Sequence, residues 1–142
     1  MKFNVQTRVD GQREIRSRFD VIARAPQASL AQIGQEEVAR VQHRIHDSKV
    51  DPDGTAWAPW SMATIRYRQR HGGSAGGLLY HTGALERSIT YTVSEKTLTI
   101  KSNVGYARYL QQGTWKMPAR RFLGWSQEAL NRIKQIIKDA VQ

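Results

Sequence analysis

The first residues of the chain alternate between apolar and polar. From Phe3 to Val9 the odd positions face one side of an extended segment and the even positions face the other, which is typical of a half-buried strand. After the turn at Asp10 and Gly11 the apolar spacing becomes helical. The pattern therefore predicts a helix over about 13–24, with these residues on its apolar face: Ile15, Phe19 and Ile22.

Longer apolar stripes predict three further helices. Ser29 is a suitable N-cap for a long helix near residues 29–47. Ser61 is suited to cap a helix that ends at about Arg70, and Ser126 to cap an amphipathic helix that closes the chain. The apolar stripe of this C-terminal helix consists of Leu130, Ile133, Ile137 and Val141.

A β-hairpin is predicted in the middle of the chain. Residues 89–93 and 97–101 are rich in β-branched side chains, alternate in polarity and flank a short polar segment. Residues 82–88 fit either a short capped helical turn or an irregular connector, and 106–110 fit a short helix. We expect residues 117–123 to form an edge strand or an extended segment.

These elements predict a single α+β domain over residues 1–142, with a small antiparallel sheet and helices against one of its faces. A chain of 142 residues is about one domain long. Residues 72–77 contain four glycines, so we expect a flexible loop there.

The charge of the chain is uneven. The whole sequence has a net charge of +10, and residues 54–127 carry ten basic but only two acidic side chains. Such a segment is expected to attract polyanions or an acidic protein partner, although a merely solvated basic surface is also compatible. Basic residues interleave with Tyr67 near its start, and the candidate DNA-facing residues are Arg66, Arg68, Arg70 and Lys116.

The sequence gives no sign of catalysis, a cofactor or a metal. It contains no cysteine, and its four histidines are too dispersed for a zinc site. Asp51 and Asp53 lack the further oxygen ligands of a calcium loop, and no serine has a positioned base. We therefore expect a protein that is not an enzyme. It has neither a signal-peptide pattern nor a transmembrane pattern, so we expect it to reside in a reducing cytoplasm without membrane contact.

Four segments in this order resemble the phage virion morphogenesis family, the tail-completion proteins of Mu-like and P2-like phages, which are related to those of HK97-like phages. They are DPDGTAWAPW (51–60), LLYHTGALERSI (78–89), VGYARYLQQG (104–113) and MPARRFLG (117–124). The last two are the most specific, because members share a Tyr-Ala pair, a Gln, a Gly and a Pro-Ala-Arg-x-Phe-Leu-Gly segment. Two positions depart from relatives: Leu110 replaces a frequent histidine and Arg121 a frequent proline.

The resemblance implies a noncatalytic protein of the virion neck, assembled in the host cytoplasm, that completes the tail and joins it to the DNA-filled head. It also implies copies arranged in a ring, with other neck and tail proteins and the DNA in the lumen as partners. Candidate subunit contacts are Trp57, Trp60, Met117, Arg120, Arg121 and Phe122.

Two alternatives stay open. Both tryptophans could instead close the base of the domain, and the protein could be a small basic nucleic-acid-binding module. We expect Phe122 to support folding, and we expect charge reversal at Arg120 and Arg121 to weaken assembly without unfolding the chain.

Overall fold

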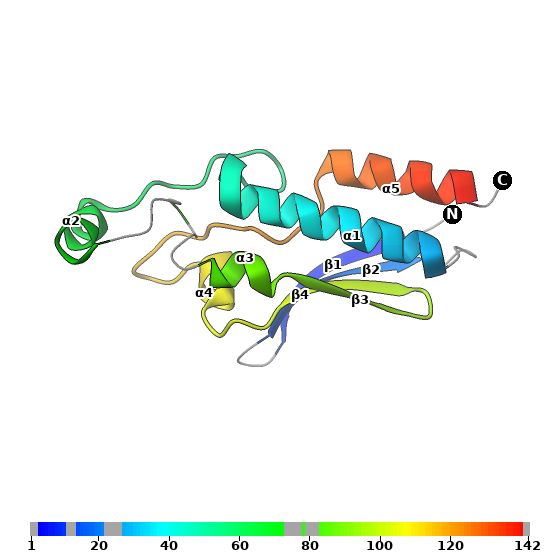
Figure 1. Ribbon diagram of the computed structural model, residues 1–142, viewed down its shortest axis with the longest axis horizontal. Helices are drawn as coiled ribbons and strands as arrows, with labels where there is room; N and C mark the ends of the chain where they lie inside the picture. Colours follow the sequence, from blue (N-terminus) through cyan, green and yellow to red (C-terminus); the bar gives the residue numbers. More distant parts are fainter. Residues whose placement is uncertain (1–2, 11–13, 22–26, 73–77, 79–82, 141–142) are drawn as a thin grey trace.

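The computed structural model describes residues 3–10, 14–21, 27–72, 78 and 83–140. Within them, antiparallel strands form a four-stranded sheet in the order β1-β2-β4-β3 (Figure 1). The strands are β1 (Phe3–Asp10), β2 (Glu14–Val21), β3 (Thr90–Ser94) and β4 (Thr97–Ser102). The predicted α+β class and the central hairpin are confirmed.

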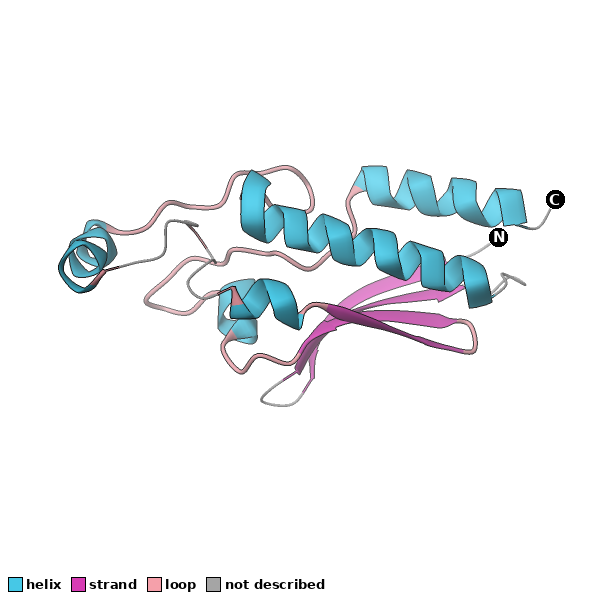
Figure 2. Cartoon of the chain, viewed as in Figure 1, coloured by secondary structure: helices cyan, strands magenta, loops and turns pink. Residues whose placement is uncertain are grey.

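The helices of the described residues lie mainly on one side of this sheet (Figure 2). They are α1 (Gln27–His43) with its π-helical continuation η1 (Arg44–Ser48), α2 (Met62–His71), α3 (Ala84–Ser88), α4 (Ala107–Gln112) and α5 (Gln127–Ala140). The predicted long helix, C-terminal helix and the helix after Ser61 are confirmed. The side chains of Ser61 and Ser126 accept backbone N–H hydrogen bonds at their helix starts, as expected of N-caps. The third expected N-cap, Ser29, is wrong, because α1 already begins at Gln27 and Ser29 lies within it.

One predicted helix is wrong. Residues 14–21 of the predicted 13–24 helix form β2, which pairs with β1 on one side and β4 on the other. Apolar residues four positions apart share a face in both a helix and a strand, so the spacing of Ile15 and Phe19 fits either structure. Pairing with two neighbouring strands, which supplies hydrogen bonds along both edges, decides the outcome in favour of the strand.

The core lies between the sheet and the pair of helices α1 and α5. Alternate residues of β4 are buried, among them Leu98 and Ile100, because they face α1. Gly34 lets α1 approach closely, since a Cβ atom there would lie 2.5 Å from the Tyr91 ring. The largest fully buried side chains of the described residues come from α1, η1, α3, β4, α5 and the segment after α4: Phe122, Leu30, Ile33, Ile45, Leu85, Leu98, Ile100, Leu123, Ile133 and Ile137.

Two further predictions concern residues 117–123 and the glycine-rich loop at 72–77. Residues 117–123 form neither helix nor strand, so the predicted edge strand is absent, and the β-bridge of this segment joins Met117 to the nearby Thr114. Residues 73–77, most of the predicted flexible loop, lie outside the described residues. Helix α2 lies at one end of the molecule, apart from α1 and the sheet (Figure 1).

Candidate interaction surface

Gln111 joins α4 to the extended segment that follows it. Its side chain is 7% exposed, and its Oε1 atom accepts hydrogen bonds from the backbone N–H groups of Phe122 and Leu123, both at 3.1 Å. Its Nε2 atom donates to the carbonyl oxygen of Leu123 at 2.8 Å. One amide side chain thus supplies the pairing that a neighbouring strand would give this backbone.

Arg120 ties the same segment to the loop before α2. Its guanidinium donates from Nε to the carbonyl oxygen of Ala58 at 2.8 Å and from Nη2 to that of Pro59 at 3.0 Å. The side chain is buried, and among the described residues it makes no ion pair. Burial lowers the pKa of Arg120 below its usual value. This cation has a structural role, because it donates hydrogen bonds to backbone carbonyl oxygens of an irregular loop.

Trp57 and Arg121 complete this connection. The buried Trp57 indole donates from Nε1 to the carbonyl oxygen of Arg121 at 2.9 Å. The exposed Arg121 side chain forms ion pairs with Asp51 and Asp53, each at 3.2 Å. A hydrogen bond from the backbone N–H of Thr55 and, less strongly, the charge of Arg121 hold the pKa of Asp53 below its usual value. We call Trp57, Gln111, Arg120 and Phe122 the clamp.

The clamp changes the expectations for the subunit interface. Trp57, Arg120 and Phe122 are each at most 7% exposed, so these side chains pack within the chain and offer almost no surface to a neighbour. The expectation that Phe122 supports folding agrees with its complete burial. Charge reversal at Arg120 is expected to break the fold, contrary to our expectation from the sequence, because it would place a carboxylate against two carbonyl oxygens.

The other three interface candidates stay accessible. Trp60 and Met117 are partly buried and Arg121 is exposed. The predicted closure of the domain by both tryptophans describes Trp57 well, whereas Trp60 lies farther out, with the Arg68 guanidinium carbon 4.2 Å from its ring centroid.

Aromatic side chains that the sequence analysis did not single out are exposed beside the clamp. Tyr106 and Tyr109 flank the start of α4 and are 47% and 44% exposed, and Trp115 is 91% exposed. Trp115 sits in a turn closed by hydrogen bonds in both directions between the backbones of Thr114 and Met117. We call Tyr106, Tyr109 and Trp115 the aromatic edge. An apolar residue inside the polar run from Gln111 to Lys116 is the signal that could have identified Trp115.

Cations lie over two rings of this edge. The Arg108 guanidinium carbon is 4.6 Å from the Tyr109 ring centroid, and the Lys116 Nζ atom is 4.8 Å from that of Trp115. Arginine, tyrosine and tryptophan are the residues that most often dominate binding at protein interfaces. The arrangement therefore suits contact with another macromolecule.

The four candidate DNA-facing residues do not form one surface. Arg66 and Arg70 are exposed on α2, Arg68 is partly buried against Trp60, and Lys116 lies on the separate turn beside Trp115. Arg68 thus holds α2 in place, while Arg66 and Arg70 stay available to a ligand.

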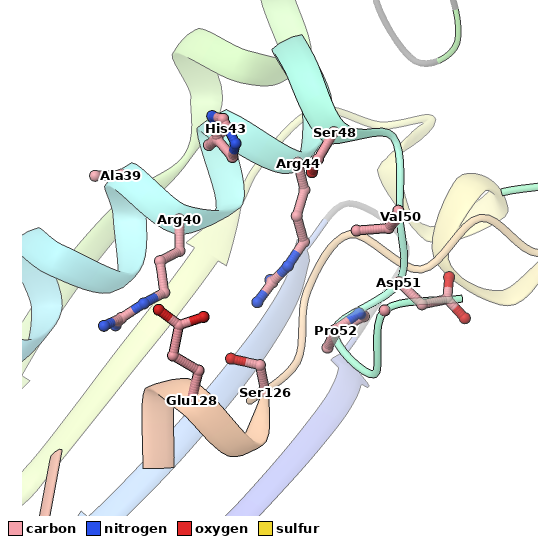
Figure 3. Close-up of a pocket in the computed structure, with 11 residues that line it drawn as sticks. Ala39, Arg40, His43, Arg44, Ser48, Val50, Asp51, Pro52, Ser126 and Glu128 are labelled. Carbon is pink, nitrogen blue, oxygen red and sulfur yellow. The ribbon is translucent and has the colours of Figure 1, made fainter. Parts of the chain in front are cut away.

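A pocket of about 540 Å³ opens between η1, the Asp51–Gly54 turn and the start of α5 (Figure 3). The guanidinium ends of Arg40 and Arg44 lie near Glu128 and Ser126, at the start of α5. Arg44 donates to the carbonyl oxygen of Phe122 at 3.0 Å, so this buried cation supports the clamp.

A buried carboxylate lies beside the same arginines. Burial raises the pKa of Glu37 to about 7, even though Arg44 and Arg40 oppose this shift. No cluster of three metal-ligating His, Cys, Asp or Glu side chains occurs among the described residues, and none of the helices they form is long and apolar enough to cross a membrane.

Comparison with known proteins gives one match. Neither the curated proteins nor the solved structures include a significant match to this chain. The family model of the phage virion morphogenesis family matches residues 11–142, a range that contains the clamp, the aromatic edge and α2. On the strength of that match, the chain belongs to the phage virion morphogenesis family.

Proposed function

We propose that this protein is a structural component of the phage neck, which completes the tail and joins it to the DNA-filled head as a ring of subunits. It works by packing against copies of itself and against other neck and tail proteins, and it turns over no substrate. Family membership supports the coarser part of this proposal, a role in virion morphogenesis.

The aromatic edge is the observation that carries the proposal. A Trp side chain that is 91% exposed on a closed turn leaves a large apolar surface in water. Covering an aromatic side chain of this kind removes about 200 Å² from water, worth about 5 kcal/mol before the costs of association are subtracted. Tryptophan is among the residue types that most often anchor a protein–protein interface.

The clamp supports the same role. It links the loop before α2, the end of α4 and the segment after Trp115 through hydrogen bonds donated by buried side chains. A contact surface that is already rigid loses little conformational entropy on binding, so more of its contact energy is available for association. In a ring, one face of each subunit contacts a different face of the next subunit. The end of the molecule that carries the aromatic edge can supply one of these two faces.

Particles produced without this protein test the proposal. We expect electron micrographs to show full heads separated from tails, and wild-type protein added to such extracts to restore joined particles. Joined, infectious particles in the absence of the protein would overturn the joining role.

The native mass of the purified chain separates this function from the alternative. A small basic nucleic-acid-binding module would bind duplex DNA tightly as a monomer and would be absent from finished virions. Detection of the chain in purified virions, together with an oligomer large enough to close a ring, supports the structural role.

A further inference from the structure

Helix α2 adds nothing to the core, and a capping serine and one arginine–tryptophan contact support it. None of its residues is buried, and it lies at one end of the molecule away from α1 and the sheet (Figure 1). Ser61 caps its start by accepting a hydrogen bond from the backbone N–H of Thr64 at 3.2 Å. Arg68 packs on the ring of Trp60, which connects the helix to the loop held by the clamp.

The exposed side of α2 is cationic. Residues 54–72 contain no Asp or Glu, and neither Arg66 nor Arg70 forms an ion pair with any described residue. These two arginines are four positions apart, so they share one face of the helix with their Cβ atoms about 6 Å apart. Tyr67 and His71 stack at 4.2 Å between ring centroids on the neighbouring face.

This face matches a polyanion better than a protein groove. A helix that docks on a protein usually presents an apolar stripe of anchors, as in helix-in-groove complexes. Arg66 and Arg70 instead present long, exposed cationic side chains with no acidic neighbour on their own segment. Phosphate contacts of arginine need no apolar pocket and carry no sequence information, which suits a duplex that must move past the protein.

We propose that the exposed face of α2 contacts the phosphate backbone of double-stranded DNA through Arg66 and Arg70. This inference rests on the proposed function, because the duplex is the genome that crosses the neck. Arg68 is a positioning residue: it packs on Trp60 and orients the helix without contacting phosphate.

Fluorescence anisotropy of a labelled 30-base-pair duplex tests the proposal directly. Wild-type chain is compared with the double variant Arg66→Gln/Arg70→Gln at several NaCl concentrations. The matched control is Lys134→Gln/Lys138→Gln, which removes two exposed charges with the same spacing from α5. Since α2 buries no residue, the arginine variant is expected to fold, and circular dichroism checks this.

We expect the arginine variant to bind duplex about tenfold more weakly at moderate salt, and the slope of log K against log salt to fall by about two. The lysine variant should change affinity less than twofold. If the arginine variant and the lysine variant weaken duplex binding equally, the effect is one of net charge alone, and the proposal is overturned. Absence of wild-type binding at low salt would overturn it too.

Two further measurements complete the test: the binding of a poly-glutamate peptide and electron microscopy of whole particles. Arginine-dependent binding of poly-glutamate that exceeds duplex binding would assign the face to an acidic protein and overturn the DNA contact. If separated heads and tails accumulate without the protein while the arginine variant binds duplex normally, only the present inference fails. If joined particles form without the protein, the proposed function fails.

Discussion

The side-chain amide of Gln111 makes three hydrogen bonds to the backbone of Phe122 and Leu123. Replacing it with alanine leaves two N–H groups and one carbonyl buried without partners, so Gln111→Ala is expected to lower the free energy of unfolding by about 3 kcal/mol. Urea denaturation followed by tryptophan fluorescence measures this. The neighbouring Gln112 is exposed, and Gln112→Ala should change stability by less than about 0.5 kcal/mol. Equal effects would contradict the clamp.

Gly113 is a second residue on which the clamp depends. Its backbone has φ +76° and ψ 172°, a region that is open almost only to glycine, and a Cβ atom would lie 2.6 Å from the backbone nitrogen of Ala119. We expect Gly113→Ala to reduce stability by about 3 kcal/mol. Gly54 also has positive φ but nothing within 4 Å of its Cβ position, so Gly54→Ala should cost about 1 kcal/mol. Thermal or urea unfolding of the two variants compares them, and a smaller loss at Gly113 would be inconsistent with the contact.

Glu37 makes stability depend on pH. Its folded pKa of about 7 exceeds the unfolded value, so its contribution is complete below about pH 4.5 and is lost as pH rises through 7. The loss from this group is on the order of 3 kcal/mol. Glu37→Gln should flatten this decline, which urea titrations at pH 5 and pH 8 would detect. The readout is the difference in the free energy of unfolding between pH 5 and pH 8. If Glu37→Gln and wild type show the same difference, Glu37 titrates normally.

At the residue scale the sequence identified the right segments but gave several side chains the wrong role. Trp57, Arg120 and Phe122 were candidates for subunit contacts, whereas all three are internal. For Trp57 the alternative, closure of the base of the domain, is the better description. Arginine is rarely buried without a carboxylate, so composition alone favoured an exposed Arg120. Its partners are carbonyl oxygens of a loop 61 and 62 residues away, and no local pattern reveals such a pairing.

At the element scale, the sequence pattern predicts two elements that depend on contacts between residues close together in the sequence. The β3–β4 hairpin joins strands separated by a tight turn, and α5 combines an N-cap with a strong apolar stripe, so both were predicted. Strand β2 is the exception: it pairs with the adjacent β1 across a short turn, yet the spacing of its apolar residues fits a helix as well as a strand. Its pairing with β4, some 80 residues away in the sequence, is the part that no local pattern reveals.

Helix α2 should be separable from the rest of the fold. A proline within it removes helical hydrogen bonds, but no buried contact is lost, because α2 has no buried residue. Gln69→Pro is therefore expected to lower the free energy of global unfolding by less than about 1 kcal/mol. Lys134→Pro, at an exposed position of α5, should cost about 3 kcal/mol or more, since α5 buries Ile133 and Ile137. Thermal melts by circular dichroism compare the two, and equal losses would show that α2 is part of the cooperative core.

At the scale of the whole molecule, the candidate contact surfaces lie toward one end. The core between the sheet, α1 and α5 fixes the clamp, and beyond the clamp lie the aromatic edge and α2. The five exposed large hydrophobic side chains of the described residues all come from these two segments: Met62, Tyr67, Tyr106, Tyr109 and Trp115. Two separate surfaces thus lie beyond the clamp: the aromatic edge, which we propose contacts protein, and α2, which we propose contacts DNA through Arg66 and Arg70.

This division makes a test of assembly possible. Trp115→Ala removes the most exposed aromatic side chain but no buried contact, so the monomer should keep its stability within about 0.5 kcal/mol. If Trp115 anchors a subunit contact, the oligomer should dissociate at roughly thirtyfold higher concentration, a loss of about 2 kcal/mol at the interface. Sedimentation velocity over a concentration series measures this.

Met62→Ala is the matched control, because Met62 is 63% exposed but belongs to α2. It should leave the oligomer intact, since we propose that α2 contacts DNA and that the aromatic edge contacts protein. Dissociation caused equally by both variants would place α2 in the subunit contact as well and remove the distinction between the two surfaces. Dissociation by neither would exclude the aromatic edge as the anchor, because an interface residue that dominates binding cannot be truncated without effect.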